Sequence, residues 1–194
     1  ALDALTSGAN NTGIGHIALS ANTEGVRNVA LGGFSLNTNT TGNDNVGIGT
    51  GSARGALHSN TTGSNNVGVG ANALGNNTTA SNNTAVGLSA LYANTTGTYN
   101  VSVGSLALDA NTEGNYNTAI GGVALSANTT GSNNTMVGYY AGVANTTADN
   151  NTAVGFGAFQ SNTTGTNNVA MGVYTLDANT TGGSNVAIGN NAMS

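Results

Sequence analysis

The side chains that could carry acid–base or metal chemistry are few and scattered. Among 194 residues there are seven acidic residues, two arginines, two histidines and no lysine or cysteine. Catalysis needs paired titratable groups, or a nucleophile held by a base. Asp109 and Glu113 are near neighbours without a counterpart base, and His16 and His58 are several repeats apart, which argues against a shared metal site. We therefore predict no enzymatic activity, no metal and no cofactor.

The charge balance excludes two further classes of partner. With a formal net charge of −5 and only two basic side chains, the chain has no basic surface to neutralise phosphates, which argues against nucleic acid and anionic membranes. No apolar run approaches the roughly 20 residues of a membrane span. Scarce charge with much Asn, Thr and Gly is typical of proteins outside the cell, so we expect an extracellular or cell-surface location.

One stretch of the sequence departs from its surroundings. Between Gly49 and the next "NTTG" the chain reads "TGSARGALHS", four residues longer than elsewhere, and it holds Arg54, Leu57 and His58. A bulge on a regular surface can carry recognition, so these three residues form a candidate partner loop. The alternative is a tolerated surface loop without a partner.

The chain also contains the N-x-T pattern of N-glycosylation. Five of these positions are possible glycosylation sites, although any repeat rich in Asn and Thr generates the pattern by composition: Asn39, Asn60, Asn94, Asn128 and Asn162.

A short repeat organises all of these residues. The glycine that closes each "AVG" or "AIG" recurs every 17 residues, except for an interval of 21 at the insertion: Gly15, Gly32, Gly49, Gly70, Gly87, Gly104, Gly121, Gly138, Gly155, Gly172 and Gly189. A fixed short period is typical of a solenoid, in which each unit is buried only against its neighbours. We predict an all-β fold, a parallel β-solenoid of about eleven 17-residue coils, forming one domain over residues 1–194.

The residues before each aligned glycine predict a strand. In "TAVG" at 84–87, Thr84 and Val86 are two apart and share one face, while Ala85 takes the other. We expect the larger pair to point into the coil and the small residue to give a flat outer face that invites close apposition. Leu91, four residues after the glycine, is expected to close the core from the opposite side.

Two polar positions recur along the chain and predict ladders at the corners of the coils. One is the Asn four residues before the glycine: Asn28, Asn45, Asn66, Asn83, Asn100, Asn117, Asn134, Asn151 and Asn168. The other is the Asn-Thr pair of "NTT" or "NTE", as in Asn94, Thr95, Asn128 and Thr129. Stacked amides can bond to one another and to turn backbone, so we interpret these residues as structural.

The short motifs that end at the aligned glycines resemble those of a known family. "NTAVG", "NVAMG" and "NVAIG" are similar to the "SVAIG" core of the head repeats of trimeric autotransporter adhesins. The longer unit "NTAVGxxALxANTTG" resembles repeat arrays of bacterial surface proteins and phage tail fibres. The resemblance implies a left-handed roll that assembles as a trimer, in an extended extracellular rod used for adhesion or display.

Three functions remain open from the sequence. The first is a structural or adhesive fibre segment that self-associates, as a homotrimer or a head-to-tail filament, and possesses a surface for a glycan or a cell. The second is an ice-binding solenoid that uses Thr ladders such as Thr40-Thr41 and Thr95-Thr96. The third is a glycan-binding tail-fibre shaft, with candidate aromatic patches at Tyr92, Tyr99 and Tyr116 and at Tyr139, Tyr140 and Phe156.

Overall fold

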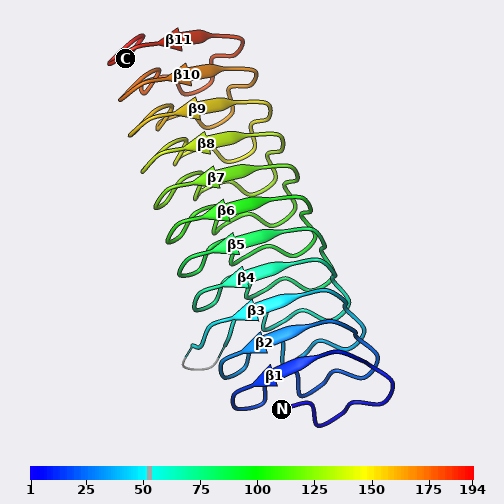
Figure 1. The fold of residues 1–194 in the computed structure, drawn as a ribbon. Helices are drawn as coiled ribbons and strands as arrows, with labels where there is room; N and C mark the ends of the chain where they lie inside the picture. Colours follow the sequence, from blue (N-terminus) through cyan, green and yellow to red (C-terminus); the bar gives the residue numbers. More distant parts are fainter. Residues whose placement is uncertain (52–53) are drawn as a thin grey trace.

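Eleven short strands stack one above another along one side of a rod (Figure 1). The structure is a computed structural model that describes residues 1–51 and 54–194. The strands are β1 (Thr12–Ile14), β2 (Val29–Leu31), β3 (Val46–Ile48), β4 (Val67–Val69), β5 (Thr84–Val86), β6 (Val101–Val103), β7 (Thr118–Ile120), β8 (Thr135–Val137), β9 (Thr152–Val154), β10 (Val169–Met171) and β11 (Val186–Ile188). The prediction of an all-β parallel solenoid is confirmed. The insertion lies between β3 and β4.

The strands form one parallel sheet in sequence order, and each residue pairs with its counterpart in the next repeat. Between β5 and β6, for example, Ala85 pairs with Ser102. The Thr84 N–H donates to the Asn100 carbonyl of the following coil at 2.8 Å, and the Gly87 N–H donates to the Val69 carbonyl of the preceding coil at 2.8 Å. Strands stacked about 4.8 Å apart make a rod roughly 50 Å long.

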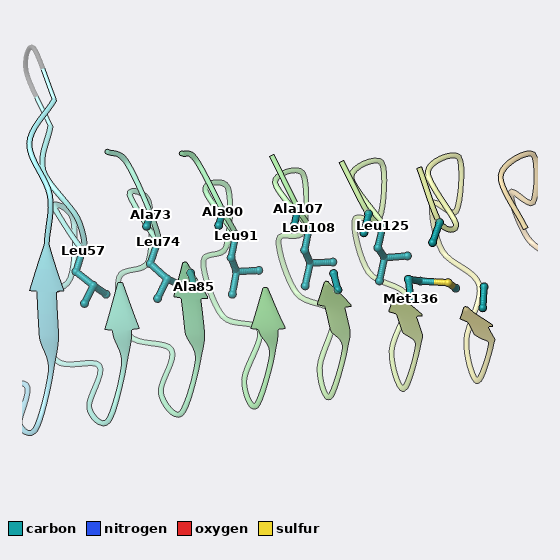
Figure 2. Packing of buried hydrophobic residues seen from close by; sticks show 14 of the residues in the cluster. Leu57, Ala73, Leu74, Ala85, Ala90, Leu91, Ala107, Leu108, Leu125 and Met136 are labelled. Carbon is teal, nitrogen blue, oxygen red and sulfur yellow. The ribbon is translucent and has the colours of Figure 1, made fainter. Parts of the chain in front are cut away.

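The core is a narrow column of small side chains and one large one per coil. Ala90 and Leu91 are fully buried, and their counterparts in neighbouring coils stack above and below them (Figure 2). The predicted role of the leucine is therefore confirmed. Most coils bury a leucine against the next coil at this position, so the core continues from coil to coil.

The predicted orientation of the strands is wrong. Ala85 is fully buried, whereas Val86 on the supposed inner face is 36% exposed, and the middle residue is buried in ten of the eleven strands. The coil is too narrow for large side chains on the strand. A Cβ built on Gly68 would already lie 3.2 Å from the Ala73 carbonyl oxygen and 3.3 Å from Leu57 Cγ. Room for little more than a methyl group selects Ala, Gly or Ser here and sends the β-branched residues outward.

The aligned glycines allow the chain to turn away from each strand. They all have positive φ, from +119° at Gly32 to +154° at Gly49. A Cβ on Gly32 would lie 2.6 Å from the Gly49 carbonyl oxygen of the next coil. Backbone conformation and close coil stacking therefore both require glycine at this position.

One coil exchanges the sizes of two facing core residues. Where the other strands hold a small middle residue, β8 has Met136, which is fully buried. Six residues later Gly142 replaces the usual leucine, and a Cβ there would lie 2.6 Å from Met136 Sδ. The methionine therefore fills the volume that the missing leucine leaves.

This exchange predicts strong coupling between the two positions. Met136→Ala should destabilise the rod by about 3 kcal/mol because it leaves a cavity, and Gly142→Leu alone should clash with the methionine. The double variant recreates the usual Ala and Leu pair. Leu125 holds the equivalent position at φ +54°, so a leucine can adopt this backbone conformation. We therefore expect the free energy of unfolding of the double variant to lie within about 1 kcal/mol of that of the unmodified chain. Urea unfolding followed by circular dichroism measures this, and simple additivity would contradict it.

Candidate functional surfaces

Two asparagine ladders converge on one carbonyl in each coil. Asn83 Nδ2 donates to the Gly97 carbonyl at 2.8 Å, and Asn94 Nδ2 donates to the same oxygen at 2.9 Å. Each ladder also links neighbouring coils, because Asn94 Nδ2 donates to Asn77 Oδ1 at 2.9 Å and the Asn100 N–H donates to Asn83 Oδ1 at 2.9 Å. The amides satisfy backbone groups that the three-residue strands leave unpaired.

The ladder asparagines lie inside the rod. Those named from the sequence are at most 1% exposed: Asn28, Asn45, Asn66, Asn83, Asn94, Asn100, Asn117, Asn128, Asn134, Asn151 and Asn168. Their predicted structural role is confirmed by these bonds. The partner threonines are half-buried, and Thr95 Oγ1 and Thr129 Oγ1 donate to the Thr112 and Thr146 carbonyls at 3.0 and 3.1 Å. Their hydroxyl donors are therefore used within the rod.

The five candidate glycosylation sites belong to the second of these ladders. Asn39, Asn60, Asn94, Asn128 and Asn162 are all fully buried, and each Nδ2 donates hydrogen bonds inside the coil. A glycan on Nδ2 would remove these bonds and would have no space. The folded rod therefore excludes glycosylation at these positions, which corrects the expectation from the N-x-T pattern.

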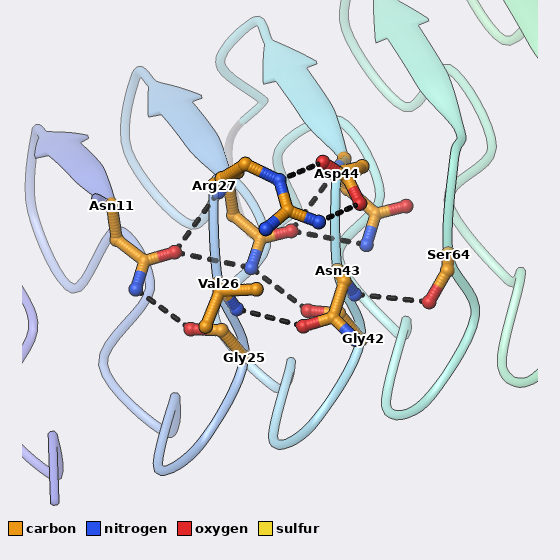
Figure 3. Close-up of polar contacts among 10 residues, drawn as sticks. Asn11, Gly25, Val26, Arg27, Gly42, Asn43, Asp44 and Ser64 are labelled. Carbon is orange, nitrogen blue, oxygen red and sulfur yellow. Dashed lines mark hydrogen bonds and ion pairs between the residues drawn. The ribbon is translucent and has the colours of Figure 1, made fainter. Parts of the chain in front are cut away.

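A third polar ladder was missed in the sequence. The Val26 N–H donates to Asn43 Oδ1 at 2.8 Å, and the Asn43 N–H donates to Ser64 Oγ at 3.0 Å (Figure 3). Further along, the Ser132 N–H donates to Asp149 Oδ1 at 2.6 Å. The sequence feature that could have predicted this ladder is a short side chain with an oxygen, two residues before the ladder Asn in most repeats: Asn43, Ser64, Ser81, Thr98, Asn115, Ser132, Asp149 and Thr166.

The charged groups do not assemble a reactive centre. Arg27 and Asp44 form a two-point ion pair between neighbouring coils, at 2.5 and 2.7 Å, and the hydrogen bond from the guanidinium lowers the pKa of Asp44 (Figure 3). Partial burial raises the pKa of Asp109. Across residues 1–51 and 54–194 there is no group of three or more His, Asp or Glu placed to hold a metal ion, and no pocket is found.

The structure separates the three residues of the candidate partner loop. Leu57 is fully buried and serves as the core leucine of its coil, so its placement in the loop is corrected. Arg54 is exposed, and its Nη1 donates to Asn76 Oδ1 at 2.8 Å and to Tyr92 Oη at 3.0 Å. His58 is half-buried. Its pKa is lowered mainly by this burial and, to a smaller extent, by the positive charge of Arg54. Ser52 and Ala53 of the insertion lie outside the described residues.

The outward side of the sheet, here called the strand face, is uncharged and mostly apolar along the rod. It consists of the first and third residues of the eleven strands, 22 residues in all. The first position is always Val or Thr, and the third is Ile, Val, Leu or Met. Exposure reaches 60% at Ile14 and 68% at Ile188, and none of the 22 side chains is charged.

The apolar surface continues past the glycines onto the narrow edge of the rod, here called the glycine edge. It comprises the first two residues after each aligned glycine. Exposed large apolar side chains on it are Leu88, Leu106, Tyr139, Tyr140, Phe156, Val173 and Tyr174. Four of these form an aromatic cluster: the Tyr139 and Phe156 centroids are 5.8 Å apart, those of Phe156 and Tyr174 are 5.3 Å apart, and those of Tyr139 and Tyr140 are 4.4 Å apart.

The other predicted aromatic patch is only partly assembled. Tyr99 and Tyr116 stack with centroids 5.1 Å apart and an interplanar angle of 6°. Tyr92 lies five residues after its aligned glycine and contacts Arg54 instead. The first grouping is thus a pair, and the second gains Tyr174 as a fourth member.

Comparison with protein-family models, with curated proteins and with solved structures found no match for this chain. Nowhere in the described ranges 1–51 and 54–194 is there a helix long and apolar enough to cross a membrane. The surfaces themselves therefore provide the basis for assigning a role.

The buried ladder predicts a contrast between two adjacent asparagines. Asn134 is buried and its Nδ2 donates to the Ala148 carbonyl at 2.8 Å, whereas Asn133 is exposed. Asn134→Asp replaces a donor with a carboxyl group that faces an acceptor, so we expect a loss of more than about 2 kcal/mol at pH 7. Asn133→Asp should change stability by less than about 0.5 kcal/mol.

The destabilisation by Asn134→Asp should depend on pH. Burial raises the pKa of the introduced carboxyl above its unfolded value of about 3.9. The folded variant then binds more protons than the unfolded chain. Its loss of stability relative to the unmodified chain therefore grows as the pH rises above 4 and shrinks as the pH falls toward 4. Urea unfolding at pH 4 and pH 7 measures both variants. Equal deficits for the two substitutions would show that the ladder is dispensable.

Proposed function

We propose that this chain is a non-enzymatic structural segment of an extracellular fibre, a stiff rod that associates side by side with further copies of itself. The observation that carries the proposal is the strand face. Its 22 side chains contain no charge, and Ile14, Leu31, Ile120, Met171 and Ile188 are each at least 39% exposed. A contiguous, mostly apolar patch of several hundred Å² is often a functional surface, which supports the strand face as the site of association.

The shape of this face supports a second copy as the partner. The strands are in register from β1 to β11, so the face is long and regular. A long regular surface is best covered by one of matching length and repeat, and another copy of this rod has both. The continuous backbone ladder and the three polar ladders provide the stiffness that a fibre needs.

The adhesive and cell-surface parts of the proposal rest on sequence features. Charged residues make up 5% of the chain and cysteine is absent. The "NTAVG" units resemble the head repeats of trimeric autotransporter adhesins, which implies an extracellular rod for adhesion or display. In such a rod the outward surfaces that remain after association would be available to a glycan or a cell.

A charge on the strand face tests the association. Ile120→Lys places an ammonium group on this face, where Ile120 is 39% exposed. We expect the unmodified chain to form a defined oligomer by light scattering after size exclusion, and the variant to associate at least about tenfold more weakly with unchanged circular dichroism. Thr130→Lys, at an exposed position away from the sheet, is the matched control and should associate normally. A chain that is monomeric at every concentration refutes the proposal.

Ice binding is a second candidate, and the strand face supports it better than the Asn-Thr ladders do. On β5, β7, β8 and β9 the outward pair is Thr followed by Val or Ile, which gives regular ranks of hydroxyl and methyl groups. The Asn-Thr ladders first considered offer only one exposed hydroxyl column, because the other is bonded inside the rod. Thermal hysteresis that disappears in Thr135→Lys would support this function, and unaltered ice growth at high concentration would reject it.

A further inference from the structure

The strand face is too small to hold two rods together unaided. Eleven strands spaced about 4.8 Å apart and about 10 Å long cover roughly 500 Å². Stable interfaces bury about 800 Å² on each partner. If the rods associate as proposed above, the interface must continue around one edge of the sheet.

The two edges of the sheet differ in chemistry. On the side where the strands begin, the residue before each ladder Asn is Arg27 in one coil and Asp44 in the next, and Asn or Ser in most others, with Tyr99 and Tyr116 as the aromatic exceptions. On the side where the strands end, the glycine edge exposes Leu88 at 53%, Tyr139 at 48% and Phe156 at 43%. The glycine edge extends the apolar surface over more coils than the opposite edge, where Tyr99 and Tyr116 form an isolated pair.

This apolar edge occupies a defined part of the rod. From the coil of β5 to that of β10 each coil except that of β7 exposes at least one large apolar side chain there, and Val123 of β7 is half-buried. In the coils of β3 and β4 the described residues of the edge are Thr50, Gly51, Ala71 and Asn72. The contact surface is thus an L in cross-section, formed by two adjoining sides between β5 and β10.

We propose that copies of this chain associate as a closed ring of parallel rods, in which the strand face of one copy packs against the glycine edge of the next. A single flat partner covers one side of the L, so burying both sides requires two different neighbours. Two unlike surfaces in contact form a heterologous interface, which closes into a ring when the rotation permits. The rods must then run parallel, because a rotation about an axis along the rods preserves their direction.

The corner between the two sides suits such an axis. The aligned glycines have no side chains, so neighbouring rods can approach closely where their corners meet. The aromatic cluster lies just beyond this corner, with the Tyr174 ring against Gly157 and the Tyr139 ring against Gly122. Large rings held in place by packing are typical anchors of protein interfaces.

Disulfide cross-linking tests the arrangement, because the chain has no cysteine of its own. Met171→Cys places a thiol on the strand face and Val173→Cys places one on the glycine edge of the same coil, at 41% and 42% exposure. We expect cross-linked chains when the two single variants are mixed, unfolded and refolded together, and little cross-linking of either variant alone. Light scattering should give one species of at least three chains.

Other outcomes would overturn the ring, and they separate it from the proposed function. Efficient cross-linking of Met171→Cys alone indicates two strand faces packed against each other in parallel. Cross-linking of Met171→Cys only with Leu31→Cys indicates an antiparallel pair. In both cases self-association stands and the ring is wrong. A chain that stays monomeric at all concentrations contradicts both the ring and the proposed self-association.

Two tyrosines provide a matched test of the edge. Tyr174 on the glycine edge and Tyr116 on the opposite edge are both exposed with φ near +50°. Ser89 and Ser184 occupy the equivalent positions in other coils, so serine is compatible with both sites. We expect Tyr174→Ser to weaken association roughly tenfold and Tyr116→Ser to leave it unchanged. An equal effect of the two substitutions would also contradict the ring.

Discussion

The narrow interior of the coil is the constraint on which the rest of the structure depends. The strand backbone lies so close to the opposite turn that the middle strand residue has space for about one methyl group, as the contacts of Gly68 with Ala73 and Leu57 show. In most coils one leucine fills the remaining volume. The larger residues of every strand except β8, where Met136 lies inside, must then face outward, whatever their hydrophobicity. Because the core is this narrow, apolar side chains lie on the outside of the rod. An apolar exterior in turn favours association.

Asparagine suits the other half of the interior for a related reason. In the ladder that contains Asn100, each side chain accepts a hydrogen bond from the backbone of the next coil and donates one to a turn carbonyl, so it needs both an acceptor and a donor. The amide of Asn100 meets this requirement: its Oδ1 accepts the Asn117 N–H and its Nδ2 donates to the Gly114 carbonyl. Aspartate has no donor and serine is too short to reach both partners. Neutral ladders also explain how a rod can be held together with very few charges.

The repeat, the strands and the asparagine ladders could be predicted from the sequence because they depend on period and residue type alone. The inside of the coil could not. Alternation shows that Thr84 and Val86 share a face, but only the width of the coil decides which face is buried. Leu57 was misplaced for a similar reason: the insertion interrupts the period, and the "AL" pair that resumes it reads as part of the loop. Leu91 at φ +52° follows no local preference, because left-handed conformations disfavour leucine.

Association through a repeated surface depends on the number of coils. Each coil adds about 90 Å² to the surface buried between two strand faces, worth roughly 2 kcal/mol at about 25 cal/mol per Å². The loss of translational and rotational freedom costs about 4–15 kcal/mol and is incurred once. In the proposed assembly short arrays would therefore remain separate, and even eleven coils would need surface beside the strand face, because only part of the gain from burial appears as binding free energy. In the proposed ring the apolar glycine edge between β5 and β10 supplies that surface, so contact between the rods would be strongest in this segment.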